Sequence, residues 1–262
     1  MMGDKKALQA GTSHYLGQNF AKAFDVKFQN EDNEEEYVYA TSWGVSTRLI
    51  GALIMVHGDD KGLRLPPKIA PIQIVVIPIL RKNDNEDKLM NYLKTLISEL
   101  SNIDIRIHVD TRPKMSPGFK FNEWEMKGVP IRLEVGSRDM KNNQVCIARR
   151  DSGEKLSLNI NDAIIEIPVL LDEIQKSLFQ QALNFRNENT FNVSTWDDFK
   201  LAIDKGGFVR CGWDGTDETE NKIKAETKAT IRCIPFDDKP SDLKCIFSGE
   251  PAKHQAIFSK AY

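Results

Sequence analysis

The chain has 262 residues, and 36 lysines and arginines nearly balance 38 aspartates and glutamates, which leaves a formal net charge of −2. Hydrophobic residues make up 40% and charged residues 28%, which are ordinary values for a soluble globular protein and exclude a highly charged disordered chain. The longest apolar stretch, Ile69–Leu80, contains Pro71 and Pro78 and is shorter than the ~18–20 residues that a membrane helix needs.

The cysteines and the N-terminus bear on the compartment. Cys146, Cys211, Cys233 and Cys245 lie far apart and form no CxxC pair, a pattern that suits a reducing compartment. The residues after Met1 lack the apolar core of a signal peptide. We therefore expect a cytoplasmic protein of two or three domains that is not attached to a membrane.

The first section of the chain, residues 1–71, is expected to be β-rich with one helix. Val38–Gly44 has the composition of a strand, and Thr47–Val56 is an apolar run. The acidic segment Asn30–Glu36 is predicted to be a surface loop, and residues 58–62 a turn. Pro66 and Pro67 end the section.

The second section, residues 72–172, alternates between strand and helix patterns. We predict strands at Ile72–Leu80, Ile103–Val109, Pro130–Gly136 and Gln144–Arg149, and helices at Asn85–Leu100, Gly118–Lys127 and Ile164–Leu183. The last helix is expected to be interrupted at Pro168. Strands separated by helices predict a small α/β domain with a mostly parallel sheet.

The third section, residues 173–262, predicts a small α+β domain. Helices are expected at Thr195–Lys205, with Ser194 or Thr195 as the N-cap, and at Thr216–Thr227. Strands are expected at Phe208–Trp213, Ala229–Ile234 and Ala256–Phe258.

The near-neutral net charge conceals a basic middle section. Residues 105–155 contain 11 lysines and arginines against 7 acidic residues, whereas residues 156–195 contain 2 against 5. A local cationic excess is consistent with a phosphate-bearing partner, although a solvated surface has the same composition.

Longer stretches of the sequence resemble one enzyme family. Residues 9–20 are similar to part of the catalytic domain of prolyl-tRNA synthetases, and Thr41–Gly51 is similar to their class II motif 3. Residues 57–71 continue this resemblance. Ser116–Pro130 resembles the anticodon-binding domain, and Ala252–Tyr262 resembles the C-terminal domain of the archaeal and eukaryote-like type.

The resemblance implies a fold and a function. It implies the C-terminal piece of an antiparallel-sheet class II catalytic domain (1–71), a mixed-sheet α/β anticodon-binding domain (72–172) and a small α+β C-terminal domain (173–262). Members of the family are proline–tRNA ligases, which activate L-proline with ATP and Mg²⁺, transfer it to tRNA(Pro), and form homodimers in the cytoplasm.

The departures from the family are as informative as the matches. Motif 1, motif 2 with its ATP-binding arginine, and the earlier proline-pocket segments have no counterpart in the 262 residues. We therefore expect a fragment, a split gene product or a truncated reading frame, and no proline-dependent exchange of pyrophosphate into ATP by this chain alone.

The resemblance also implies site residues. Arg48 corresponds to the motif 3 arginine that grips the triphosphate, Gln9, Thr12 and Ser46 to ATP contacts, and His14 to a position lining the proline pocket. A guanidinium suits phosphate because it stays charged and offers paired donors, and it stabilises charge that develops on phosphate oxygens. Outside the motif, Arg48 would more simply be a surface cation.

In the anticodon-domain resemblance we expect tRNA contacts from one aromatic residue and its basic neighbours, because unpaired bases are read by stacking and phosphates by cations. Trp124 could equally be a packed core residue. The expected contact residues are Arg112, Lys114, Lys120, Trp124, Lys127 and Arg132.

No zinc is expected. In many relatives the C-terminal domain holds zinc through four cysteines that begin with a C-x4-C pair. Here Thr216 stands at that spacing from Cys211, and Ser248 stands where the second cysteine pair would end after Cys245. Tetrahedral structural zinc needs four ligands.

The sequence also bears on two other functions. A non-catalytic RNA-binding module is the alternative, since the anticodon-binding part is present while most of the catalytic domain is not. An unrelated nucleotide-binding enzyme is disfavoured because no GxGxxG or GxxxxGK[ST] loop joins a strand to a helix.

Overall fold

The structure is a computed structural model that describes residues 1–80, 84–237, 240 and 242–262. The chain divides into two compact units. One unit combines Met1–Leu53 with Phe191–Tyr262, and the other consists of Ile54–Thr190.

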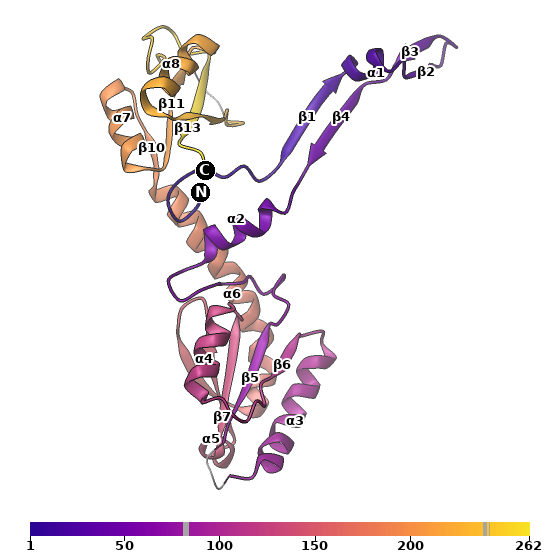
Figure 1. Cartoon of the computed structure of the whole chain (residues 1–262), viewed down its shortest axis with the longest axis vertical. Coiled ribbons are helices and arrows are strands. Elements are labelled where there is room, and N and C mark those ends of the chain that lie inside the picture. The colour runs from indigo at the N-terminus through magenta and orange to yellow at the C-terminus, as the bar shows by residue number, and fades with distance from the viewer. Residues whose placement is uncertain (81–83, 238–239, 241) are drawn as a thin grey trace. The chain divides into compact units, whose positions relative to one another are not determined.

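The unit Ile54–Thr190 is built on a five-stranded mixed sheet with the strand order β6-β5-β7-β8-β9. Its strands β5, β6 and β7 are labelled in Figure 1. β5 pairs in parallel with β6 and β7, whereas β7–β8 and β8–β9 are antiparallel. The strands are β5 (Ile74–Ile79), β6 (Ile107–Val109), β7 (Ile131–Gly136), β8 (Gln144–Arg149) and β9 (Lys155–Asn159).

Helices cover both faces of this sheet. On one face, leucines of α3 (Glu86–Asn102) and apolar residues of α6 (Ile160–Glu188) pack against Ile74, Leu133 and neighbouring side chains. On the other face, α4 (Pro117–Met126) buries Trp124 against Val75 and Ile77. The short helix α5 (Ser137–Lys141) lies between β7 and β8. Because successive strand residues face opposite sides, β5 contributes to both cores.

The prediction of a mixed-sheet α/β domain is confirmed, but the prediction of a mostly parallel sheet was wrong. Only seven residues separate Gly136 from Gln144, and a parallel crossover needs about a dozen or more. β8 therefore returns antiparallel to β7, and β9, which the sequence reading missed, pairs with it.

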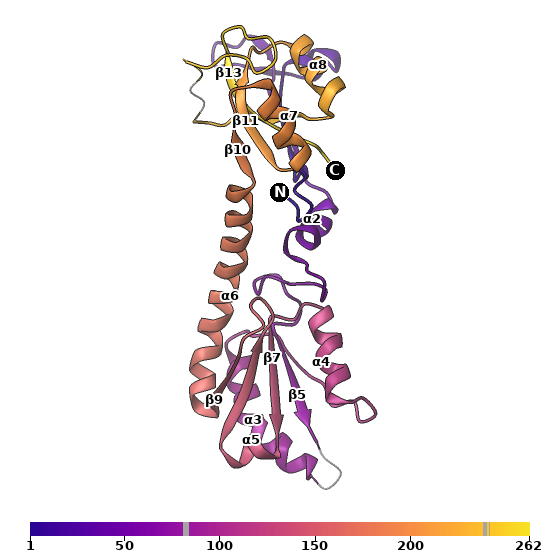
Figure 2. The same ribbon diagram turned by 90° about the vertical axis from the view of Figure 1, so that its left-hand side faces the viewer.

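The predicted interruption at Pro168 was also wrong. α6 runs without a break through Pro168 for 29 residues (Figure 2). A proline inside a helix removes one backbone hydrogen bond, but residues such as Ile167, Leu171 and Ile174 on the same helix are buried against the sheet. This burial outweighs the local cost of the proline.

The first part of the other unit is a two-stranded antiparallel ribbon of β1 (Thr12–Gly17) and β4 (Ala40–Gly44), which lie side by side in Figure 1. Between them come α1 (Asn19–Ala23) and the hairpin of β2 (Lys27–Gln29) and β3 (Glu35–Tyr37). The predicted acidic loop is exposed, although its last residues belong to β3. The apolar run that follows β4 forms the helix α2 (Arg48–His57), which has no buried residue.

The remainder of this unit is a small α+β domain, as predicted. Its sheet has the order β10-β11-β13-β12 and is covered by α7 (Trp196–Lys205) and α8 (Asp217–Thr227), with Phe199 and Phe258 at the centre of the core. The strands are β10 (Thr190–Asn192), β11 (Phe208–Trp213), β12 (Thr230–Cys233) and β13 (His254–Ser259). Thr195 caps α7 by accepting a hydrogen bond from the Asp198 amide, which explains where that helix begins.

The expected boundary between residues 172 and 173 falls inside α6. Within the described ranges, no helix has both the length and the apolar composition to cross a bilayer.

Candidate functional site

The residues predicted to contact ATP lie around one hollow. Gln9, Thr12, Ser46 and Arg48 all line a depression of about 320 Å³ where β1 begins and β4 ends. The pairing of Thr12 with Gly44 brings the two chain segments together. Neighbouring glycines at positions 11 and 44 keep the hollow open, since they add no side chain to it. The motif resemblance therefore selected residues that are distant in sequence and adjacent in the structure.

Arg48 is the cation of this hollow. It is exposed at the start of α2, and among the described carboxylates none lies within 4 Å of its guanidinium. Its backbone N–H donates to Ser46 Oγ at 3.3 Å, and Gln9 Nε2 donates to Thr12 Oγ1 at 2.9 Å. The guanidinium thus keeps its donors available for an anionic ligand.

His14 does not line the hollow. It lies on β1 opposite Ser42 and is exposed. Thr12 and His14 are two residues apart on the strand and so share a face. A proline-binding role for His14 stays a prediction.

Three of the predicted tRNA contacts converge on one buried carboxylate, Asp110. Arg112 donates from Nε and from its terminal nitrogen at 2.9 and 2.7 Å, and Trp124 Nε1 donates at 2.8 Å. Lys120 Nζ lies 3.5 Å from Asp110 Oδ1 and donates to the Asp110 carbonyl at 2.9 Å. Hydrogen bonds from Arg112 first, and from Trp124, hold the pKa of Asp110 well below its usual range despite desolvation.

This arrangement limits what Lys120 and Trp124 can offer to RNA. The side chain of Lys120 is only 6% exposed, so it would have to leave Asp110 to reach a nucleotide. Trp124 is buried and can be reached only through the cavity that it lines. Arg112 is partly exposed, but it is shared between Asp110 and Glu123. The roles of all three in tRNA binding stay predictions.

The remaining two lysines differ in their surroundings. Lys127 Nζ pairs with Glu123 at 2.8 Å and lies 4.4 Å from the centre of the Trp124 ring. Lys114 is exposed in the turn before α4. Their roles also stay predictions.

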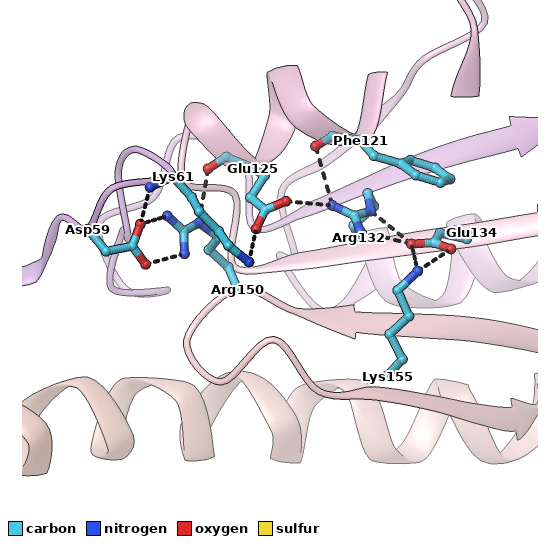
Figure 3. Close-up of polar contacts among 8 residues, drawn as sticks. All are labelled: Asp59, Lys61, Phe121, Glu125, Arg132, Glu134, Arg150 and Lys155. Atoms are coloured by element: carbon cyan, nitrogen blue, oxygen red, sulfur yellow. Dashed lines mark hydrogen bonds and ion pairs between the residues drawn. The ribbon is translucent and has the colours of Figure 1, made fainter. Parts of the chain in front are cut away.

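Arg132 lies in a different place, a cavity of about 160 Å³ between β7, β8 and the end of α4. Its guanidinium donates to Glu134 at 2.9 and 3.0 Å and to the Phe121 carbonyl at 3.3 Å (Figure 3). It also stands 4.6 Å from the centre of the Phe121 ring. Lys155 Nζ on β9 reaches both oxygens of Glu134, at 2.8 and 2.9 Å. Arg132 and Lys155 thus line the cavity as cations together with Trp124, and the Phe121 ring lies beside these two cations.

Glu125 supplies this cavity with an acceptor. Its carboxylate forms ion pairs with Lys61 Nζ at 3.4 Å and with the Arg132 guanidinium at 4.0 Å (Figure 3). Within the described parts of the chain, no closer hydrogen bond to its oxygens is found. Glu134, by contrast, accepts from both Arg132 and Lys155. Glu125 therefore has free acceptor capacity that an incoming ligand could use.

The sequence reading found Arg132 and missed Phe121, Glu125 and Lys155. Phe121 and Glu125 are four residues apart on α4, a spacing that places them on the same side of a helix. Lys155 follows the turn after β8 and reaches the cavity only because β9 pairs with β8. Helical spacing could have found the first two, but Lys155 required the strand order.

The C-terminal domain shows what surrounds the cysteines. Cys211 and Cys245 are both buried, and burial together with the nearby Cys245 raises the pKa of the Cys211 thiol. The Thr216 and Ser248 hydroxyls each donate to Asp214 at 2.8 Å. No group of three or more His, Cys, Asp or Glu suited to a metal occurs in the described ranges. The expectation of no zinc stays a prediction.

A cavity that joins cations, a carboxylate that accepts no close hydrogen bond among the described residues, and an aromatic ring is suited to reading an unpaired nucleobase. Consistent with this, residues 73–169 match the family model of the anticodon binding domain. The unit Ile54–Thr190 therefore contains a domain of the anticodon-binding class.

The other comparisons name the family. Residues 196–262 match the model of the prolyl-tRNA synthetase C-terminal domain. The whole chain is 49% identical to proline–tRNA ligases of Christiangramia forsetii and Phocaeicola vulgatus, covering 54% and 53% of them. It is 52% identical to that of Chlorobium chlorochromatii, covering 56%. The chain thus spans about half the length of these curated relatives, and it is similar to the C-terminal portion of prolyl-tRNA synthetases.

Proposed function

We propose that this chain is the anticodon-reading and ATP-contacting part of a proline–tRNA ligase, and that the unit Ile54–Thr190 binds tRNA(Pro). The observation that carries the proposal is the cavity lined by Arg132, Glu125 and Lys155, with the Phe121 ring beside Arg132, inside a domain that matches the anticodon-binding family. The cation excess of residues 105–155 adds a surface that attracts phosphate.

The cavity has the chemistry to select guanine. A carboxylate such as that of Glu125 accepts the adjacent N1–H and N2–H donors on the pairing edge of guanine, and adenine lacks that donor pair. A cation such as Arg132 can donate to the guanine O6 and N7 acceptors. Proline codons begin with CC, so every tRNA(Pro) anticodon contains two guanines. The Phe121 ring adds stacking, which does not distinguish one base from another.

The experiment compares two tRNA transcripts, one with the anticodon UGG and one in which a single anticodon guanine is changed to adenine. We expect the chain to bind the first about 10-fold more tightly or better, since one good base contact contributes roughly 1–3 kcal/mol. Affinity for both should fall steeply as salt is raised, because phosphates are neutralised in each complex.

Glu125→Gln tests the residue, with Glu99→Gln on the exposed face of α3 as the matched control. Glu125→Gln should lose most of the preference for the guanine transcript, whereas Glu99→Gln should keep it. Equal affinity of the unaltered chain for both transcripts would reduce the domain to a generic cationic surface.

For the hollow at Arg48 we propose contacts to ATP from Gln9, Thr12, Ser46 and Arg48, and a contact to L-proline from His14. The common location of the first four residues and the unpaired guanidinium support this. Mg²⁺, a homodimeric assembly and a cytoplasmic location belong to the same proposal. Arg48→Ala should weaken the binding of Mg–ATP measured by calorimetry, and unchanged binding would remove Arg48 from the site.

A non-catalytic tRNA-binding module remains the second candidate. The five-stranded sheet around the Arg132 cavity has its own hydrophobic core, whereas β1 and β4 of the ribbon are mostly exposed. This contrast favours the second candidate, because only the tRNA-binding part has a core of its own. Proline-dependent exchange of pyrophosphate into ATP separates the candidates. We expect no exchange by these 262 residues alone, because they contain no motif 2 arginine, and robust exchange would exclude the non-catalytic module.

A further inference from the structure

The segment that joins α2 to β5 lies against the Arg132 cavity, although it precedes the residues that match the anticodon-binding family. The amides of Leu63 and Leu65 donate to the carbonyls of Met126 and Gly128 at 2.9 and 3.2 Å. Gly62 has a φ of +125°, and a Cβ there would lie 2.5 Å from the Met126 backbone. We call residues 58–70 the linker; its backbone is in direct contact with the end of α4.

One arginine ties the linker to Glu125. The guanidinium of Arg150 donates to both oxygens of Asp59, at 2.8 and 2.5 Å, and its Nε donates to the Glu125 carbonyl at 3.0 Å (Figure 3). The Arg150 side chain is only 7% exposed, whereas the Asp59 side chain is 37% exposed, so Arg150 is the buried member of this pair. The hydrogen bonds from Arg150 lower the pKa of Asp59 to about 2, and Asp59 is therefore an anion at neutral pH.

A second contact places a cation beside the Glu125 carboxylate. The Asp59 carboxylate accepts from the Lys61 amide at 2.9 Å, which fixes the backbone of the turn. Lys61 Nζ then lies 3.4 Å from Glu125 Oε1, and Lys61 lines the cavity together with Arg132. Glu125 thus stands between a cation of the linker and a cation of β7.

We propose that the linker is part of the base-reading pocket: Lys61 orients the Glu125 carboxylate, and Asp59 is a positioning residue that acts through Arg150 and the backbone of Lys61. This inference rests on the proposed function, in which Glu125 accepts hydrogen bonds from an anticodon guanine. Two residues outside the matched domain therefore contribute to anticodon selectivity.

The direct test is Lys61→Met, measured with the two transcripts described above. The matched control is Lys68→Met, which removes another exposed lysine of the linker that does not line the cavity. Lys61→Met should lower the affinity ratio between the guanine and adenine transcripts about two- to fivefold, the effect expected from loss of an exposed ion pair. Lys68→Met should leave the ratio unchanged, and Lys61→Arg should restore it.

Asp59→Asn gives an independent readout. It should reduce the ratio at least as much as Lys61→Met, while circular dichroism shows an unchanged fold. If Lys61→Met weakens both transcripts equally, Lys61 is only a phosphate contact and the inference is wrong. If the unaltered chain discriminates but neither variant changes the ratio, the inference fails while the proposed function stands. If the unaltered chain does not discriminate, the proposed function fails and the inference falls with it.

Discussion

Replacing Asp110 by asparagine should strongly destabilise the unit Ile54–Thr190. The Asp110 side chain is 0% exposed and receives hydrogen bonds from Arg112 and Trp124, with Lys120 beside it. An asparagine would present an NH₂ group to these donors and would leave the Lys120 ammonium buried beside a neutral group. Breaking a buried ion pair in this way costs about 3–5 kcal/mol, a large share of the roughly 5–15 kcal/mol that stabilises a typical domain.

The assay is native-state hydrogen exchange at the amides of β5 and β7, because it reports on this unit alone even though the chain has two. Asp172→Asn, on the exposed face of α6, is the control and should change the opening free energy by less than about 0.5 kcal/mol. A change below about 1 kcal/mol for Asp110→Asn would show that the buried ion pair does not hold this unit together.

The same carboxylate predicts a pH dependence with a definite sign. The pKa of Asp110 is lower in the folded chain than its ordinary value of about 3.9, so its contribution is fully present above that value. The contribution is lost as the pH falls toward the lower folded pKa. The difference in opening free energy between the unaltered chain and Asp110→Asn should therefore be constant near pH 7 and shrink below about pH 4.

Two further substitutions test individual contacts. Pro168→Ala would return an N–H donor to the Ile164 carbonyl inside α6. It should raise the free energy of unfolding, measured in urea, by about 1–3 kcal/mol. A lower free energy of unfolding would mean that the proline ring is needed for packing. Ser248→Ala removes one of three hydroxyl donors to Asp214, whose pKa is lowered, against burial, by Ser248 and two threonines. It should lower the melting temperature of the C-terminal domain through a loss of about 1–2 kcal/mol, and an unchanged melting temperature would contradict the contact.

The sequence predicted the elements whose apolar residues recur with a clear period. It did not predict those that depend on pairing or packing with distant parts of the chain. The leucines of Glu86–Asn102 recur at helical spacing and become the buried face of α3, so this helix was predicted to within two residues. β9 was missed because its five residues gain stability only by pairing with β8. The continuity of α6 depends on the sheet beneath it, which no local pattern around Pro168 reveals.

The two sets of site residues illustrate the same difference. The residues around Arg48 were selected by motif, and motifs preserve positions that the fold brings together, so four of them line one hollow. The tRNA contacts were selected partly by charge, and a count of cations in the sequence does not show which carboxylates pair with them. Lys120 belonged to that set, yet Asp110, ten residues earlier, holds its ammonium in the interior.

The number of hydrogen bonds that each carboxylate accepts also explains why Glu125 is a better candidate for ligand contact than the carboxylates around it. Asp110 and Glu134 each accept several hydrogen bonds from neighbouring side chains, and an incoming base would have to displace one of them. Among the described residues, Glu125 has two cations nearby, at 3.4 and 4.0 Å, and these distances are longer than those of an ordinary hydrogen bond. A ligand with two adjacent donors can therefore bind Glu125 without breaking any existing hydrogen bond. Among the carboxylates around this cavity, Glu125 is therefore the one that we propose as the acceptor for an incoming base.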